Sequence, residues 1–186
     1  VEYRRRLAQW KRNKNNPSLI GKLELDPLPG FPLPGALQVN TITVDEDYRG
    51  RGIAKALYGI VLTIMRRPLV AGYAQTPGGR QNWVSLASIP GVEIRGYVSL
   101  EDDLLNPNTD FKPARKPAEQ RIDIIMGKLG GEYIGESPNG NHYFAFDVQP
   151  NSTGRELEAY VKTNLSKVYN ETYNMTTGLY AVWTGQ

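Results

Sequence analysis

The chain has 186 residues, a hydrophobic content of 40%, a charged content of 22% and a net charge of +3. These values are typical of one folded domain with a buried core, and they argue against a disordered tail, a coiled coil or two full domains. Because the sequence has no cysteine and a single histidine, it excludes disulfides and thiolate chemistry and disfavours a zinc site or a histidine-dependent triad.

The N-terminal segment VEYRRRLAQWKRNK lacks the apolar stretch of a signal peptide, and no apolar run in the chain approaches the ~18 residues of a membrane span. The sequence therefore predicts a cytoplasmic protein that makes no membrane contact. The same segment interleaves cations with Tyr3 and Trp10, a pattern compatible with nucleic-acid binding. A solvated, basic helix over residues 2–13 is the favoured interpretation.

The first predicted elements are two strands joined by a loop. In residues 18–27, apolar and polar side chains alternate, which predicts a strand that ends at Pro27. The prolines of residues 28–35 exclude a central strand or a helix and predict a loop that could lie over a pocket. Residues 37–44 are rich in β-branched side chains and predict a central strand. Because side chains alternate between the two faces of a strand, one face of this strand should carry Leu37, Val39, Thr41 and Thr43.

A helix and a second buried strand follow the polar turn at residues 45–52. Apolar side chains recur at helical spacing and predict one buried face. The side chains of this face are Ile53, Leu57, Ile60, Val61 and Ile64. Arg66 and Arg67 suit the negative end of the helix, and Pro68 ends it. Residues 69–75 then predict a strand parallel to residues 37–44, joined to it by a right-handed crossover.

The second half of the chain predicts alternating helices and strands. We expect a short helix within 78–91, a strand over 92–100 and an irregular segment over 101–113. A helix from Ala118 to Leu129 should begin after Pro117 and end at the glycine pair 130–131.

The last elements are a hairpin, a capped helix and a strand. Residues 132–148 alternate around Pro138-Asn139-Gly140, which predicts the hairpin. Thr153 and Glu156 have the spacing of a capping box at the start of a helix. Residues 178–185 predict a final strand, which we expect to fill a sheet position that the short N-terminal segment leaves vacant.

The segment VDEDYRGRGIAKALY (44–58) combines a strand end, a glycine-rich turn and the start of a helix. The first turn of a helix presents amides without intrahelical partners and the positive end of the helix dipole, and both favour phosphate. Gly50 and Gly52 allow close approach to the backbone, and Arg49 and Arg51 add positive charge. Neither GxxxxGK[ST] nor the third glycine of GxGxxG is present, which disfavours nucleotide hydrolysis.

This segment resembles the signature of the GNAT superfamily of acetyl-CoA-dependent N-acetyltransferases, Arg/Gln-x-x-Gly-x-Gly/Ala at the start of a long helix. Arg49, Gly52 and Ala54 carry the match, and the resemblance extends over residues 37–100. It implies an α/β (α+β) fold with a mixed, mostly antiparallel central sheet, a splayed parallel strand pair and flanking helices.

The resemblance also implies an organisation in three segments. Residues 1–36 would form a basic N-terminal segment with a strand and the proline-rich loop. Residues 37–150 would form the acetyl-CoA-binding core, and residues 151–186 a helix and strand packed on that core.

In this family the turn amides hold the diphosphate of coenzyme A, and the strand before the turn pairs with the pantetheine arm. The resemblance therefore implies acetyl-CoA as co-substrate and the following cofactor-binding residues: Ile42, Thr43, Val44, Arg49, Gly50, Arg51, Gly52, Ile53 and Ala54. The strand at 69–75 is expected to splay away from residues 37–44 and open the slot where thioester and amine meet.

Acetyl transfer depends mainly on positioning, because the thioester is already activated. The candidate general bases are Glu24, Asp45 and Glu46, and Glu24 is favoured if its strand lies beside residues 37–44. The candidate acids for the leaving thiolate are Tyr97, Ser85 and Tyr73. The family usually places a tyrosine on the helix after the splayed strand, where this chain has Trp83 and Ser85. His142 is interpreted as a structural residue of the hairpin.

Three functions are compatible with these patterns. The leading hypothesis is transfer of an acetyl group from acetyl-CoA to a primary amine of a small molecule or protein. The alternative is a catalytically silent GNAT-like domain that serves as a binding or structural module in a larger assembly. The third is acyl transfer to a nucleic acid or a nucleic-acid-bound protein, suggested by the basic N-terminal segment.

Overall fold

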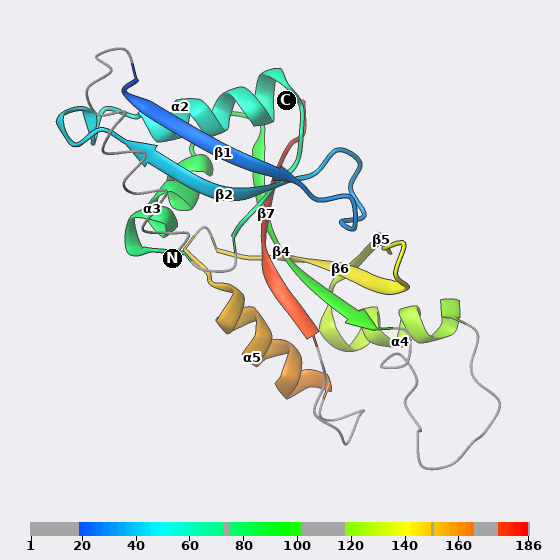
Figure 1. Cartoon of the computed structure of the whole chain (residues 1–186). Helices are drawn as coiled ribbons and strands as arrows, with labels where there is room; N and C mark the ends of the chain where they lie inside the picture. The colour runs from blue at the N-terminus through cyan, green and yellow to red at the C-terminus, as the bar shows by residue number, and fades with distance from the viewer. Residues whose placement is uncertain (1–18, 73–74, 102–117, 150, 166–174, 186) are drawn as a thin grey trace, which may run out of the picture.

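The computed structural model describes residues 19–72, 75–101, 118–149, 151–165 and 175–185. Within these ranges the strands form one seven-stranded sheet in the order β1-β2-β3-β7-β4-β6-β5 (Figure 1). The pair β2–β3 is parallel, and the other neighbouring pairs are antiparallel. This mixed, mostly antiparallel sheet with one parallel pair confirms the predicted fold class.

The bounds of most elements follow the predicted segments, but β3 covers only the first two residues of the strand predicted over 69–75. The strands are β1 (Gly21–Pro27), β2 (Leu37–Val44), β3 (Leu69–Val70), β4 (Val92–Glu101), β5 (Glu132–Glu136), β6 (Asn141–Asp147) and β7 (Met175–Trp183). The helices are α2 (Ile53–Gly59), α3 (Pro77–Leu86), α4 (Ala118–Leu129) and α5 (Gly154–Leu165). A 3-10 turn, η1 (Glu46–Tyr48), precedes α2, and a π-helical segment, η2 (Ile60–Ile64), extends it. The predicted basic helix over residues 2–13 lies outside the described residues.

Local signals set several of these bounds as predicted. The hairpin between β5 and β6 closes with a bond from the Ser137 amide to the Asn141 carbonyl oxygen (2.8 Å). The capping box of α5 is formed in both directions. The Thr153 amide donates to the Glu156 carboxylate (2.9 Å), and the Glu156 amide donates to the Thr153 hydroxyl oxygen (3.2 Å).

The helix after the glycine-rich turn buries a different face from the predicted one. In η2 the Met65 amide donates to the carbonyl oxygen of Ile60 (3.0 Å), five residues earlier. A π turn holds more residues than an α turn, so the side chains rotate away from the 3.6-residue pattern. Ile60 and Ile64 are 46% and 74% exposed, and their predicted place in the core is wrong. The side chains buried here are Tyr58, Val61 and Leu62.

Burial raises the pKa of Tyr58 from 10.0 to about 12. The unfolded chain releases this proton near pH 10, whereas the folded chain keeps it to a higher pH. We therefore expect the free energy of unfolding to fall between pH 10 and 12, by about 1.4 kcal/mol per pH unit for this group. Urea unfolding over this range should show a shallower decline for Tyr58→Phe than for the wild type, and equal slopes would contradict the assignment.

Arg66 and Arg67 make tertiary contacts at the end of η2. The Arg66 guanidinium lies 4.9 Å from the centre of the Trp183 ring on β7. The Arg67 Nε donates to the Gly35 carbonyl oxygen at 2.7 Å. These contacts tie the helix end to β7 and to the proline-rich loop, a role beyond the predicted interaction with the helix dipole.

β2 does not keep a strict alternation of faces. Its pairing with β1 shifts register, so that Glu24 lies opposite Thr41 while Leu25 lies opposite Val39. Asn40 is the extra residue of this bulge, and a bulge reverses the alternation beyond it. Ile42 therefore packs on the same core cluster as Val39. The prediction that Thr41 shares the face of Val39 is wrong for this reason.

β7 lies in the middle of the sheet, between β3 and β4. Leu69 of β3 pairs with Ala181, and Val92 of β4 pairs with Trp183. The expectation that the final strand fills an N-terminal sheet position is therefore wrong. The same sheet contains β1 from the predicted segment 1–36 and β7 from the predicted segment 151–186. The three predicted segments therefore contribute to a single fold.

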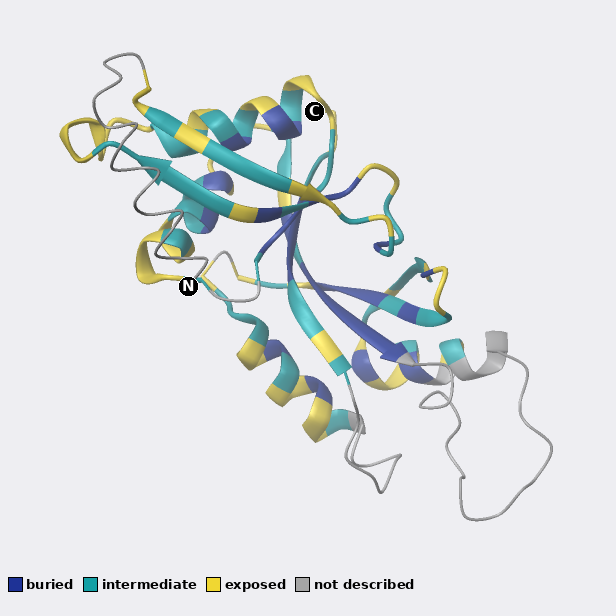
Figure 2. Ribbon diagram, viewed as in Figure 1, coloured by how far each residue is buried: buried dark blue, intermediate teal, exposed yellow. Residues whose placement is uncertain are grey.

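The helices cover one face of the sheet (Figures 1 and 2). α2 and α3 pack on one half through Tyr58, Val61, Trp83 and Leu86, and α4 and α5 pack on the other half through Ile125, Leu129, Leu157 and Val161. In Figure 2, β4 is buried along most of its length, while α5 shows an exposed outer surface. No helix among the described residues is long and apolar enough to cross a membrane.

The proline-rich loop, residues 28–36, packs on the opposite face of the sheet. Its Phe31 is 5% exposed and sits edge-on against three tyrosines of β4, β6 and β7. The ring centroids lie 5.1 Å from Tyr97, 5.3 Å from Tyr143 and 5.6 Å from Tyr180. The segment is a loop as predicted, and the Phe31 side chain fills the space beneath it.

Candidate functional site

The turn between β2 and α2 is open to solvent. Gly50 and Gly52 have φ values of +75° and +77°, a left-handed conformation that glycine adopts without steric cost. A Cβ atom built at either position would meet nothing within 4 Å. The Asp45 carboxylate caps η1 by accepting from the Asp47 amide (3.1 Å). The side chains around the turn thus leave the glycine backbone accessible.

Backbone amides of the turn are available as hydrogen-bond donors. The Ala56 amide donates to the Gly52 carbonyl oxygen (2.9 Å), which is the first bond of the helix. By helix geometry, the amides of Ile53, Ala54 and Lys55 have no acceptor within the helix. They lie at the positive end of the helix dipole, where anionic groups are stabilised.

The two arginines of the turn are held beside it by weak contacts. Arg49 Nε donates to the Val44 carbonyl oxygen (3.2 Å), and its Nη1 lies 4.0 Å from the Glu46 carboxylate. The Arg51 guanidinium lies 5.1 Å from the centre of the Tyr48 ring. Exposed contacts of this kind contribute little to stability, so both cations can turn toward an anionic ligand.

The parallel pairing of β2 and β3 is short. It joins Leu37 to Leu69 and Gln38 to Val70. Beyond it, the Ala71 amide donates to the Leu179 carbonyl oxygen of β7 (2.9 Å), while β2 continues along β1. Among the described residues, no strand pairs with the β3-facing edge of residues 42–44. That edge has the free backbone groups with which an extended ligand can pair.

Gly72 lies where the two strands separate, and only the structure identifies it. A Cβ at this position would lie 2.8 Å from the Val39 carbonyl oxygen, a backbone atom that cannot move away easily. We expect Gly72→Ala to lower the free energy of unfolding by about 1–3 kcal/mol, measured by urea unfolding. Gly30→Ala is the matched control because a Cβ at Gly30 meets nothing within 4 Å. Equal effects of both changes would show that the contact at Gly72 is unimportant.

The candidate bases lie at different places. Glu24 is on β1 opposite Thr41, and its carboxylate lies 2.7 Å from Lys22 Nζ. Asp45 is engaged in the cap of η1. Glu46 is exposed on η1 beside Arg49, at the diphosphate end of the predicted cofactor site. The structure therefore brings Glu46 to the turn and Glu24 to the neighbouring strand.

The candidate acids are not brought together. The Ser85 hydroxyl donates to the Asn82 carbonyl oxygen of its own helix (2.7 Å). Tyr97 packs against Phe31 on the face of the sheet that the helices leave uncovered. Tyr73 lies outside the described residues. Because Ser85 lies on the helical side, the two described candidates stand on opposite sides of the sheet.

His142 is buried in the hairpin. It is 3% exposed, and its Nδ1 lies 3.0 Å from the Tyr133 hydroxyl. The contact with Tyr133 and the burial fit the structural interpretation. In the part of the chain that the structure describes, no group of three His, Asp or Glu residues could hold a metal ion.

The structure also reveals residues that sequence patterns did not single out. Phe31 is the single aromatic residue of a proline-rich segment, and that isolation is the one signal that could have marked it as an anchor. Burial raises the pKa of Tyr180, which packs with Phe31 on β7. Nothing in the local sequence distinguishes Tyr180 from the other tyrosines, because its neighbours come from distant segments.

A comparison with protein families identifies one region of the chain. The model of the acetyltransferase (GNAT) family matches residues 3–76. The match begins before residue 37 and ends before residue 100, so it overlaps the stretch that carries the resemblance over residues 37–76. It contains β1, β2, the glycine-rich turn, α2 with η2, and β3. No curated protein matches the chain.

The family match contains the open turn and the parallel strand pair, and the strands beyond residue 76 complete the sheet through antiparallel pairs. The chemistry of the family is acetyl transfer in general. Residues 3–76 of this chain therefore match the acetyltransferase (GNAT) family, and the topology of the sheet is consistent with its fold.

Proposed function

We propose that the protein transfers an acetyl group from acetyl-CoA to a primary amine of a small molecule or protein. The observation that carries the proposal is the open turn at the start of α2, with left-handed Gly50 and Gly52 and free amides behind them. A diphosphate is a strong match for such a turn, because it accepts several amide hydrogen bonds and favours the positive helix end.

The proposed donor site extends from the turn along β2. The amides from Arg49 to Ala54 would hold the diphosphate, with the Arg49 and Arg51 side chains adding charge. The free edge of Ile42, Thr43 and Val44 would pair with the amides of the pantetheine arm. The thioester would then lie where β2 and β3 separate, near Gly72.

In the proposed reaction the neutral amine attacks the thioester carbonyl carbon. The C–N bond forms, the C–S bond breaks, and coenzyme A leaves as a thiolate that takes up a proton. The amine releases one proton to a base or to water. Glu24 is the preferred base because it lies on β1 beside β2, whereas Glu46 lies at the turn. Ser85 is disfavoured as the acid, because its hydroxyl already donates within α3.

Two measurements test the proposal. Isothermal titration should detect acetyl-CoA binding, and a panel of primary amines should produce acetyl-CoA-dependent release of free thiol. The thiol assay has no protein background, because the chain contains no cysteine. Absence of acetyl-CoA binding at millimolar concentrations would overturn the proposal.

A second candidate is a GNAT domain that binds the donor without turnover. It is favoured by the composition of α3, which carries Trp83 and Ser85 and contains no tyrosine. Binding of acetyl-CoA without thiol release from any amine of the panel would support this candidate. Thiol release that rises with amine concentration would exclude it.

A further inference from the structure

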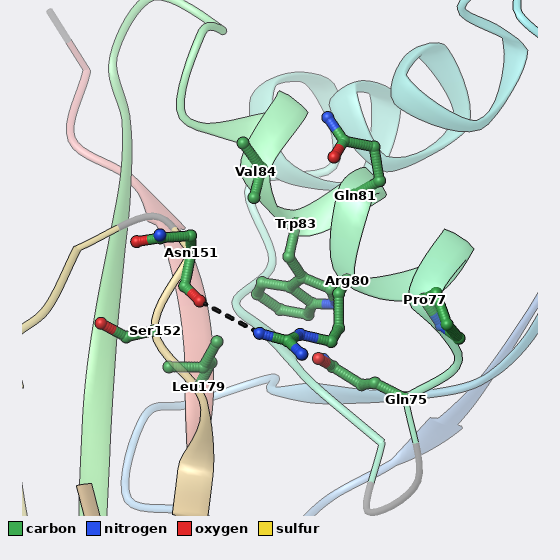
Figure 3. A pocket seen from close by; sticks show the side chains of 9 residues that line it. All are labelled: Gln75, Pro77, Arg80, Gln81, Trp83, Val84, Asn151, Ser152 and Leu179. Carbon is green, nitrogen blue, oxygen red and sulfur yellow. Dashed lines mark hydrogen bonds between the residues drawn. The ribbon is translucent and has the colours of Figure 1, made fainter. Parts of the chain in front are cut away.

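A cavity of about 220 Å³ lies between α3 and the segment that precedes α5 (Figure 3). Gln75 and Arg80 lie on one side, Asn151 and Ser152 on the other, and Leu179 of β7 beneath them. The cavity is separate from the turn at the start of α2. Trp83 lines it and also contacts Tyr58 of α2 at a ring separation of 6.5 Å, so α3 stands between the two sites.

Two of the polar side chains that line the cavity, Gln75 and Arg80, can donate hydrogen bonds to a ligand. Gln75 Nε2 is buried and has no hydrogen-bond partner among the described residues. The Arg80 guanidinium makes one long contact, from Nη2 to the Asn151 carbonyl oxygen (3.4 Å).

Among the described residues, no acidic side chain lines this cavity. Donors and one cation around a common space are suited to a carboxylate, whose oxygens only accept and carry a full charge. A buried donor that remains without a partner is costly, so the unsatisfied Gln75 amide favours a ligand with an acceptor at this point.

Apart from Gln81, the remaining residues that line the cavity are apolar. Trp83 and Leu179 are each 3% exposed, and Pro77 and Val84 complete this part of the wall. An apolar cavity of about 150 Å³ accommodates benzene in other proteins, so the larger space here can hold a ring of that size with a short carboxylate arm. The volume of the cavity and the charge of Arg80 thus favour the same kind of ligand, a small carboxylate with an apolar body.

We propose that this cavity is a binding site for a small carboxylate with an apolar or aromatic body. The carboxylate lies against Arg80 and the Gln75 amide, and the body lies on Trp83 and Leu179. This site is distinct from the acetyl-CoA site proposed above, and its occupancy does not depend on acetyl transfer.

The test uses phenylacetate and the full chain labelled with ¹⁵N. Titration should shift the Trp83 indole and Gln75 side-chain amide signals saturably at millimolar concentrations. Arg80→Ala should weaken binding about tenfold, because it removes a charge-assisted hydrogen bond. Gln75→Glu should reverse the selectivity, so that phenethylamine binds better than phenylacetate. Lys128→Ala, which removes an exposed cation from α4, is the control and should leave the affinity unchanged.

Three results would overturn the proposal. One is the absence of saturable shifts, and another is equal binding of the neutral 2-phenylacetamide. The third is displacement of phenylacetate by acetyl-CoA together with loss of phenylacetate binding in Gly52→Asp, which would assign the cavity to the donor site. If Gly52→Asp loses acetyl-CoA binding but keeps phenylacetate binding, the two sites are separate. If acetyl-CoA binding is absent from the wild type and phenylacetate still binds, the proposed function fails and this inference stands.

Discussion

Gly52→Asp should reduce acetyl-CoA affinity by about 100-fold or more. The substitution places a carboxylate at the left-handed residue that precedes α2, directly beside the proposed diphosphate site. Two like charges within a few ångströms repel, and the Cβ also blocks approach to the backbone. Asp tolerates a left-handed conformation better than most residues, so the fold should be retained. Isothermal titration with acetyl-CoA measures the effect.

Gly127→Asp is the matched control for this substitution. Gly127 is exposed on α4, and a Cβ there meets nothing within 4 Å. The control makes the same chemical change far from the turn and should keep the wild-type affinity. Thermal unfolding of both variants separates loss of binding from loss of fold. If a folded Gly52→Asp variant bound acetyl-CoA with wild-type affinity, the turn would not be part of the donor site.

Phe31→Ala should lower the free energy of unfolding by about 3 kcal/mol, the usual cost of removing a buried phenyl ring. The ring is the apolar anchor of the loop at 28–36, and it contacts Tyr97, Tyr143 and Tyr180. Removal of the ring leaves a cavity on the face of the sheet that the helices do not cover, and three edge-on aromatic contacts are lost. Urea unfolding monitored by far-UV circular dichroism measures the change.

Ile64→Ala provides the comparison for Phe31→Ala. Ile64 is a large apolar residue that is 74% exposed, so its truncation should change the free energy of unfolding by less than about 0.5 kcal/mol. If the two variants were equally stable, the loop would not be anchored by Phe31. Loss of stability in Phe31→Ala with acetyl-CoA affinity intact would place the loop outside the donor site.

The turn at residues 45–54 illustrates what local sequence predicts well. Gly50 and Gly52 adopt left-handed conformations because adjacent residues require a tight turn there, and glycine is the residue that accepts it. The hairpin around Gly140 and the capping box of Thr153 and Glu156 follow the same logic. In each case the interacting groups lie within a few positions of one another, so their spacing in the chain is also their spacing in the fold.

The predictions that the structure contradicts failed for a different reason. Ile60 and Ile64 fit a helical stripe, but the π turn of η2 rotates them toward solvent. Thr41 fits an alternating strand, but the bulge at Asn40 transfers it to the other face. One inserted residue in a helix or a strand leaves no distinct composition, yet it moves every side chain that follows it.

Local patterns in this chain decide where strands, helices and turns form, because each depends on backbone conformations and hydrogen bonds between near neighbours. The tertiary structure alone places β7 between β3 and β4, brings Gly72 against Val39, and sets Phe31 among three tyrosines. It also separates Ser85 from Tyr97 across the sheet. These contacts join residues far apart in the chain, and their energies depend on packing and close approach that no periodic pattern records.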